Sequence, residues 1–179
     1  MFSPDNLKQF CSHLQAGDVV AAPAEGVYGY CADPFNPKAL EKLLALKKRT
    51  SGKGFITLIK DWQQLEELTI PLLEQEKTTL QGHWPGRVTC ILPATKNLPE
   101  LLTGGRNTIA VRMPAADYMH EYLKAWGQPL VSTSANISGQ PPATTSKAVL
   151  GGVFALECET PLDGGVSAVL DLKSGVRVR

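Results

Sequence analysis

The sequence Pro-Leu-Val-Ser-Thr-Ser-Ala-Asn-Ile-Ser-Gly, at residues 129–139, joins a short apolar run to a cluster of small polar side chains. Leu130 and Val131 are typical of the end of a buried strand, and the turn at residues 127–129 precedes them. In an open α/β sheet, ligands usually bind at the carboxyl ends of strands, so the polar residues that follow are a candidate binding site. A turn whose side chains bond only to their own backbone is the alternative interpretation.

Apolar runs and helical patterns alternate on both sides of this segment. The apolar runs predict strands at residues 19–22, 55–59, 88–92, 108–114, 154–158 and 167–171. Helical patterns and caps predict helices at about 5–15, after Asn36-Pro37, after Asp61, after Pro71, at about 117–126 and at 145–150. Residues 23–29 and 97–107 are predicted to be loops. This order predicts one α/β domain over residues 1–179, with a twisted, open, mixed parallel and antiparallel sheet flanked by helices.

Composition excludes several classes of protein. The chain has 179 residues, of which 43% are hydrophobic and 20% charged, as in ordinary globular proteins. Its 18 basic and 17 acidic residues give no large field of one sign for long-range capture of nucleic acid, although a local basic patch stays open. No apolar run is long enough to span a membrane, and no signal peptide is evident. Its 4 cysteines form no Cys-x-x-Cys pair, which argues against a zinc site and suits a cytoplasmic protein with reduced thiols.

Residues suited to bind anions recur along the chain, whereas no Ser-His-Asp set, carboxylate pair or metal-ligand cluster is found. Basic residues at the end of a helix are favourable by roughly 0.3–1 kcal/mol, so those at 47–49 have a structural explanation. Lys53 follows a Ser-Gly step and makes a basic loop that can cover a polyphosphate. Anion-binding residues of this kind suit phosphoryl or nucleotidyl transfer, in which catalysis depends chiefly on substrate positioning and charge stabilisation. The anion-binding candidates are Lys47, Arg49, Lys53, Arg112, Ser132, Ser134, Asn136 and Ser167.

Five short motifs follow one another in the chain. They are Pro-x-Glu-x-Val-Tyr-Gly at 23–29, Lys-x-Arg at 47–49, Trp-Pro-Gly at 84–86, Ala-Val-Arg-Met-Pro at 110–114 and Ser-Thr-Ser-Ala-Asn-x-Ser-Gly at 132–139. In order and spacing they resemble the YrdC-like family, the threonylcarbamoyl-AMP synthases, in the short bacterial form. The resemblance spans nearly the whole chain, and Lys-x-Arg combined with Ser-x-Asn is its most specific part.

The resemblance implies an activity and a division of the site. The family condenses L-threonine, bicarbonate and ATP to threonylcarbamoyl-AMP and pyrophosphate, for threonylcarbamoyladenosine modification of tRNA. By resemblance, Lys47, Arg49, Ser134 and Asn136 are the catalytic residues. The residues implied to bind ATP, together with Mg²⁺, are Lys47, Arg49, Lys53, Thr108, Ser134, Asn136 and Arg179. Those implied to bind threonine are Gly26, Arg112, Ser132 and Ser167.

The same resemblance implies partners, and departures from it leave an alternative. Contact with RNA or tRNA and with downstream proteins that transfer the threonylcarbamoyl group to tRNA is expected, and contact with a membrane is not. Ala24 stands where the family usually has threonine, and Thr50, Arg87 and Val166 stand where it usually has proline. Together these departures point to weakened activity or to a paralogue with another substrate. The alternative function is that of a divergent YrdC-like paralogue that binds RNA or nucleotide without this activity. The near-neutral charge argues against RNA binding, because RNA affinity depends on neutralising phosphates.

Overall fold

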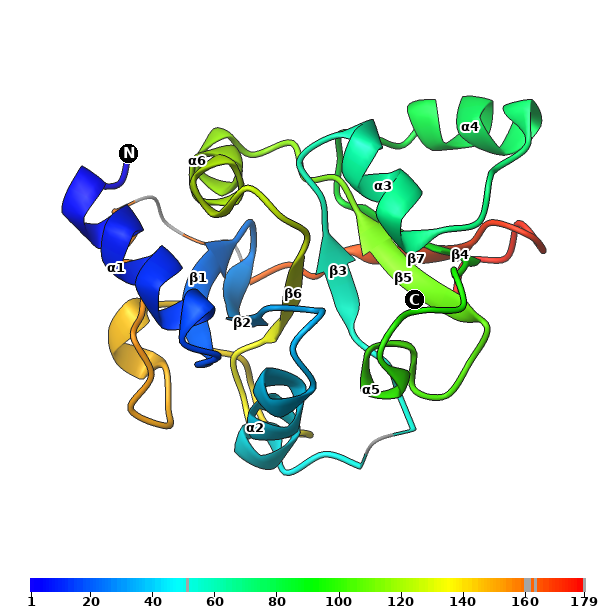
Figure 1. Cartoon of the computed structure of the whole chain (residues 1–179). Coiled ribbons are helices and arrows are strands. Elements are labelled where there is room, and N and C mark those ends of the chain that lie inside the picture. Colours follow the sequence, from blue (N-terminus) through cyan, green and yellow to red (C-terminus); the bar gives the residue numbers. More distant parts are fainter. Residues whose placement is uncertain (51, 160–161, 163, 179) are drawn as a thin grey trace.

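A mixed, open β-sheet forms the centre of the protein (Figure 1). The structure, a computed structural model, describes residues 1–50, 52–159, 162 and 164–178. Within these residues the sheet has seven strands in the order β1-β2-β6-β3-β5-β4-β7. Only β3–β5 and β4–β7 pair in parallel, and the other neighbours are antiparallel. The predicted α/β class with a mixed sheet is therefore confirmed. The strands are β1 (Val20–Ala24), β2 (Val27–Ala32), β3 (Ile56–Leu58), β4 (Val88–Pro93), β5 (Thr108–Arg112), β6 (Leu130–Ser134) and β7 (Ala168–Asp171).

Two helices begin at the capping residues that the sequence indicates, Asn36 and Asp61. The Asn36 side chain accepts from the backbone N–H groups of Lys38 and Ala39, and Asp61 accepts from that of Gln64. Both caps confirm the predicted helix starts. No helix among the described residues is long and apolar enough to cross a membrane. The helices are α1 (Pro4–Gln15), α2 (Pro37–Lys47), α3 (Trp62–Leu68), α4 (Glu74–Gln81), α5 (Glu100–Thr103), α6 (Asp117–Trp126) and the 3-10 turn η1 (Ser146–Ala148).

Hydrophobic residues pack on both faces of the sheet, because successive strand side chains point to opposite sides. One cluster joins alternate strand residues such as Tyr28 and Val131 to buried leucines of α2, α3, α4 and α5. The other joins Cys31 and Leu130 to apolar residues of α1 and α6. Along β6, Leu130 lies in this second cluster, and Ser132 and Ser134 follow on the same face. The face covered by α1 and α6 therefore changes from apolar to polar along one strand.

Three predicted segments differ from the structure. The polar residues Ser132–Ser134 belong to β6, because they pair with β2 and, at Ser132, with β3. The predicted loop at 23–29 is a hairpin, in which Ala24 pairs with Val27 across a two-residue turn. The predicted strand at 154–158 is wrong: among the described residues it makes only one bridge, between Ala21 and Ala155. β-Propensity alone could not show that these residues meet β1 at a single position.

Two smaller differences concern connecting segments. The predicted loop at 97–107 contains the short helix α5, which ends at Gly104 with a φ of 66°. The predicted short helix at 145–150 is a single 3-10 turn, Ser146–Ala148. Positive φ is accessible to glycine without steric penalty, which explains where α5 stops. This ending brings α5 against the segment between α2 and β3 that carries the predicted basic loop (Figure 1).

Candidate functional site

A cavity of about 120 Å³ opens on the polar part of the sheet face. Its volume is below the roughly 300–1,000 Å³ of pockets for drug-sized ligands, so it fits a small polar molecule rather than a whole nucleotide. It brings together residues from the β1–β2 hairpin, from β3, β5 and β6, and from residues 165–167. The lining residues are Ala24, Val27, Gly29, Ile56, Leu58, Arg87, Arg112, Ser132, Thr133, Ser134, Gly165, Val166 and Ser167.

Arg112, Glu25 and Arg87 form one end of the site, which we call the Arg112 end. Arg112 closes β5, and only 7% of its side chain is exposed. Its Nε donates to the backbone oxygen of Gly86 at 3.0 Å, and its Nη2 donates to Glu25 Oε2. Arg87 Nε lies 3.5 Å from the same Glu25 oxygen. Burial lowers the pKa of Arg112 from its usual value, yet the neighbouring carboxylate suits the charged guanidinium.

Two other predicted threonine-binding residues lie beside this end. The hydroxyl groups of Ser167 and Thr89 form a hydrogen bond, with their oxygens 3.0 Å apart. Thr89 lies on β4 immediately before Cys90, which pairs with Val111 of β5. Gly26 O accepts from Gly164 N at 2.7 Å, so the hairpin turn holds the segment that leads to Ser167. A Cβ at Gly26 would lie 1.8 Å from the backbone oxygen of Gly165. Only glycine permits this approach.

Lys47, Arg49 and Arg106 form the other end, which we call the Lys47 end. Lys47 closes α2, and its Nζ donates to Ser134 O at 2.5 Å, to Asn136 O at 3.1 Å and to Asn136 Oδ1 at 2.9 Å. Ser134 Oγ donates to the same Asn136 oxygen at 2.7 Å. Burial, followed by the charge of Arg49, lowers the pKa of Lys47 to about 8. Lys47 of the predicted Lys-x-Arg motif thus contacts both Ser134 and Asn136 of the predicted Ser-x-Asn motif.

The basic loop after α2 is held by two arginines. Arg49 Nη2 donates to Gly54 O at 2.9 Å and to Lys53 O, and its guanidinium stands 5.3 Å from the ring centre of Phe55. Arg106 Nη2 donates to Gly52 O at 3.1 Å. Burial and the nearby charge of Arg106 lower the pKa of Arg49. Among the described carboxylates, none pairs with either arginine.

Strand register sets the two ends apart. β3 lies between β6 and β5, with Ile56 opposite both Ser132 and Ala110. Ser132, Ile56 and Ala110 thus form one row across β6, β3 and β5. On one side of this row lie Ser134, at the end of β6, and Thr108, at the start of β5; Arg112 lies on the other side. Four residues at about 3.3 Å each separate Thr108 from Arg112 by roughly 13 Å along β5. This spacing separates Arg112 from the end of β6, where Lys47 donates to the backbone oxygen of Ser134.

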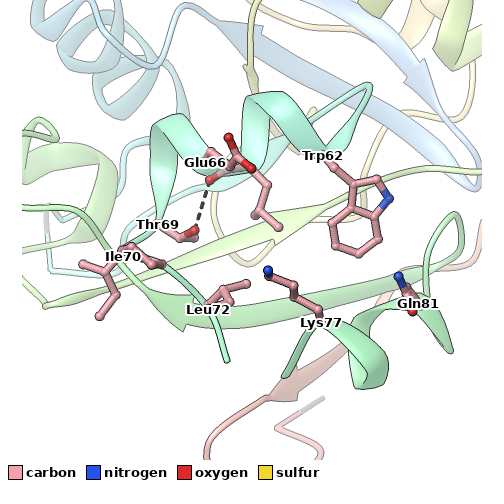
Figure 2. Close-up of a pocket in the computed structure, with 9 residues that line it drawn as sticks. Trp62, Glu66, Thr69, Ile70, Leu72, Lys77 and Gln81 are labelled. Carbon is pink, nitrogen blue, oxygen red and sulfur yellow. Dashed lines mark hydrogen bonds between the residues drawn. The ribbon is translucent and has the colours of Figure 1, made fainter. Parts of the chain in front are cut away.

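A larger cavity of about 480 Å³ lies elsewhere, between α3 and α4 (Figure 2). Trp62 and Lys77 project into it from opposite walls, and Leu65, Ile70 and Leu72 supply apolar surface. None of the predicted anion-binding residues lines it. The Trp62 ring meets that of Trp84 at 6.0 Å, which is the nearest connection to the Trp-Pro-Gly motif. The smaller cavity is therefore the candidate for the predicted chemistry.

Sequence analysis identified most of this constellation but missed three parts of it. Glu25 is inside the Pro-x-Glu motif, yet no role was expected for it; a carboxylate in a glycine-containing turn was the available signal. Arg106 follows a Gly-Gly step, and its contact with Gly52 could not be read from spacing. Arg87 was noted only as a departure from the family pattern. The side chain of Lys53 is exposed, and Arg179 lies outside the described residues.

The described residues offer no resident metal site. No group of three or more His, Cys, Asp or Glu side chains that could hold a metal ion occurs among them. Glu25, the carboxylate beside Arg112, is already paired with arginine. Mg²⁺ commonly binds through substrate phosphates with few protein carboxylates, so any Mg²⁺ here is expected to accompany a phosphate ligand.

Known proteins share both sequence and fold with this chain. Residues 12–177 match the Sua5/YciO/YrdC family, which carries the description telomere recombination. The chain belongs to this family. A threonylcarbamoyl-AMP synthase of Photobacterium profundum is 39% identical over 175 residues, 97% of this chain and 90% of the relative. One of Coxiella burnetii is 39% identical over 151 residues, 84% of this chain and 81% of the relative.

Solved structures of the Sua5/YciO/YrdC family have the same fold. The crystal structure of P. abyssi Sua5 complexed with L-threonine matches with a TM-score of 0.86 and 30% identity. That match covers 93% of this chain but 51% of the other, so this chain spans about half the length of that Sua5. E. coli YciO matches with a TM-score of 0.79 over 99% of this chain and 89% of the other; at 22% identity this comparison concerns the fold alone. The family expected from the motifs is confirmed.

Proposed function

We propose that this protein is a threonylcarbamoyl-AMP synthase, which condenses L-threonine, bicarbonate and ATP to threonylcarbamoyl-AMP and pyrophosphate. The observation that carries the proposal is the separation of two cationic groups, Arg112 at the end of β5 and the Lys47 cluster beside the end of β6. A carboxylate and a triphosphate are the substrate groups that such a pair of ends would separate. The named relatives at 39% identity support the same reaction.

Threonine is assigned to the small cavity at the Arg112 end. A guanidinium fork binds a carboxylate with matched planar geometry, which makes Arg112 the reader of the threonine carboxylate. Ser132 and Ser167, both buried, and the backbone at Gly26 supply the remaining polar surface. The Sua5 relative with bound L-threonine supports this substrate. Ala24 removes a hydroxyl from this cavity, so polar recognition rests on these other groups.

ATP is assigned to the Lys47 end. Arg49 and Lys53 would hold the triphosphate, and Ser134, Asn136 and Thr108 would meet the nucleotide beside it. Mg²⁺ would enter as part of the substrate MgATP and would neutralise part of the charge of its phosphates. Lys47 already donates to three protein oxygens, so its first role would be to hold Ser134 and Asn136 in place. Arg179 stays a predicted nucleotide contact.

The chemistry requires positioning more than proton transfer. Bicarbonate takes up a proton and loses water to give carbon dioxide, and the neutral threonine amine adds to it, forming a carbamate and releasing a proton. A carbamate oxygen then attacks the α-phosphorus of ATP, and the bond from that phosphorus to the bridging oxygen breaks as pyrophosphate leaves. Charge builds on the pyrophosphate, where Lys47 and Arg49 would stabilise it. Holding the carbamate and the α-phosphorus in line converts an encounter of two substrates into an effectively unimolecular step.

The product would serve tRNA modification in the cytoplasm. A mixed anhydride of a carbamate and AMP is labile, so downstream proteins would transfer its threonylcarbamoyl group to adenosine in tRNA. The exposed cations Lys48, Lys53 and Arg106 are the surface on which RNA contact would be sought. Direct RNA binding is not needed for the adenylation step itself.

Pyrophosphate release tests the proposal. We expect release from MgATP only when threonine and bicarbonate are both present. The matched controls omit each substrate in turn and replace L-threonine by D-threonine. Release that ignores threonine would contradict the proposed substrate, and binding of nucleotide or RNA without any release would favour the non-catalytic paralogue.

A further inference from the structure

Arg106 lies beside the basic loop between α2 and β3, although it belongs to none of the five motifs. Its Nη2 donates to Gly52 O at 3.1 Å, across 54 positions of the chain. Arg49 Nη2 donates to the next two carbonyl groups of the same loop, Lys53 O and Gly54 O, the latter at 2.9 Å. Two arginines from distant parts of the chain therefore meet at one short stretch of backbone.

Backbone packing fixes the segment that carries Arg106 against this loop. Phe55 N donates to Leu102 O at 2.8 Å, which ties the start of β3 to α5. A Cβ at Gly104 would lie 2.3 Å from the backbone nitrogen of Gly54, so only glycine permits the approach of the two segments. The meeting of the two arginines is therefore a property of the fold and not of two flexible side chains alone.

Most donors of the two guanidinium groups are not used by the part of the chain that the structure describes. A guanidinium has five N–H donors. Among the described residues, Arg49 and Arg106 each donate through Nη2 alone, and no carboxylate pairs with either. Arg106 is exposed and Arg49 is partly exposed, so a ligand can reach the remaining donors. Burial, followed by the charge of Arg106, lowers the pKa of Arg49, which is the effect of two cations close together.

This pair of arginines lies beside the place assigned to ATP. Arg106 precedes Thr108, the first residue of β5, by two positions. Strand register puts Thr108 on the same side of the sheet as Ser134, whose backbone oxygen accepts from Lys47. Lys47 is 3% exposed, whereas Arg106 is exposed. The cations of the Lys47 end thus extend from a buried lysine to an arginine in contact with solvent.

We propose that Arg106, together with Arg49, binds the terminal phosphates of ATP and is a further substrate-binding residue. The β- and γ-phosphates carry most of the charge of the triphosphate and lie farthest from the adenosine, which suits the exposed end of this set of cations. Negative charge collects on the same phosphates as pyrophosphate leaves, so the two guanidinium groups also stabilise the leaving group. The inference rests on the proposed function in that it takes MgATP as the polyphosphate.

Calorimetric titration of the intact protein with MgATP and with AMP tests this assignment. Arg106→Ala is expected to weaken MgATP binding about tenfold, the size of effect of a lost charge-assisted hydrogen bond. AMP lacks the terminal phosphates, so its affinity should change less than about twofold. Arg106→Lys keeps the charge without the planar fork and should recover part of the MgATP affinity. Equal losses for MgATP and AMP would overturn the proposal.

A second measurement separates contact with phosphate from support of the loop. Hydrogen exchange of the Phe55 amide, which donates to Leu102 O, reports whether the loop stays packed against α5. We expect its protection in Arg106→Ala to equal that of the wild type while MgATP affinity falls. A parallel loss of protection and affinity would overturn the proposal, because Arg106 would then act only by holding the loop at Gly52. Unchanged MgATP affinity would overturn it as well.

Lys96→Ala is the matched control for a general effect of charge. Lys96 is an exposed cation two positions after Ala94, whose backbone N–H donates to the oxygen of Asn107, the neighbour of Arg106. Exposed charges that do not contact the ligand are largely screened, so this variant should change MgATP affinity less than about twofold. An equal loss for Lys96→Ala and Arg106→Ala would assign the effect to the overall field and overturn a specific contact.

An inorganic polyphosphate distinguishes the inference from the proposed function. If the wild-type protein releases no threonine-dependent pyrophosphate, the proposed function fails. Titration with inorganic tripolyphosphate still decides the role of Arg106, because this probe carries linked phosphates without adenosine. Weaker tripolyphosphate binding by Arg106→Ala than by the wild type supports the proposal. Equal affinity of the two proteins, or no binding by either, overturns it.

Discussion

The Arg112 end and the Lys47 end both hold cations, but the partners of these cations differ. Arg112 and Arg87 share the Glu25 carboxylate, and the inner pair is nearly buried. Among the described residues, Lys47, Arg49 and Arg106 meet carbonyl and amide oxygens rather than carboxylates. Arg49 and Arg106 stand close enough for their like charges to lower the pKa of Arg49.

This difference indicates two ways of receiving an anion. At the Arg112 end a substrate carboxylate would meet a guanidinium that already holds the Glu25 carboxylate. At the Lys47 end a polyphosphate would meet cations with which no carboxylate among the described residues pairs, and its binding would relieve repulsion between them. Specificity is therefore expected at the first end and strong, charge-driven affinity at the second.

The largest effect is expected from Arg49→Ala. Loss of charge-assisted hydrogen bonds of about 1.5–3 kcal/mol should weaken ATP binding roughly tenfold to a hundredfold, while threonine binding without nucleotide changes little. Lys53→Ala should act in the same direction. Calorimetric titration of ATP measures both, with Lys48→Asn as the control because asparagine tolerates the φ of 48° at that position. If Arg49 served only the helix end, ATP affinity would persist and stability would fall by about 0.3–1 kcal/mol.

Arg112→Lys should give the next largest effect, on the other substrate. Lysine keeps the charge but lacks the planar fork, so the threonine KM should rise about tenfold and the ATP KM far less. Steady-state pyrophosphate release with each substrate varied gives both constants, and thermal unfolding checks that the variant is folded. Equal shifts in the two constants would assign Arg112 to a structural role or to a different ligand.

A smaller, pH-dependent effect is expected at Lys47. Its pKa is lowered from 10.5 to about 8, chiefly by burial, so the ammonium is present below pH 8 and is lost as the pH rises through that value. ATP favours the charged form, hence ATP affinity should fall several-fold between about pH 7 and about pH 9, with proton uptake on binding above pH 8. Titration in buffers of different ionisation enthalpy measures the uptake. Lys47→Met should bind ATP weakly at both values, and a flat wild-type profile would remove Lys47 from the ATP-binding set.

The smallest expected effect compares the two ends directly. Because the Lys47 end is partly exposed and lacks an internal anion among the described residues, ATP affinity should decrease more steeply with salt than threonine affinity. Raising sodium chloride from about 0.05 M to about 0.5 M, with potassium fluoride as a second salt, tests this by calorimetry. Equal salt dependence at both ends would contradict the proposed contrast.

Local signals in the chain were sufficient for α1, α2, α3, α4 and α6, for the sheet class and for the motif that carries the site. Asn36 and Asp61 cap helices through hydrogen bonds to backbone groups two or three residues away, which are contacts that spacing can predict. The alternation of Leu130, Ser132 and Ser134 on one face of β6 is likewise a property of three neighbouring positions, although its strand was expected to end earlier. Single β-residues such as Ala155 were misassigned because propensity does not specify a partner strand.

The pairings that make the site depend on the folded chain. Glu25 meets Arg112 across 87 positions, and Lys47 meets Asn136 across 89. Whether a charged residue is neutralised, and by which partner, follows from strand register and from how a hairpin turn packs, and both are properties of residues far apart in sequence. For this reason the motifs identify the cations, whereas only the tertiary structure shows which of them is paired with a carboxylate. Arg112 is paired with Glu25, and Arg49 donates to backbone oxygens.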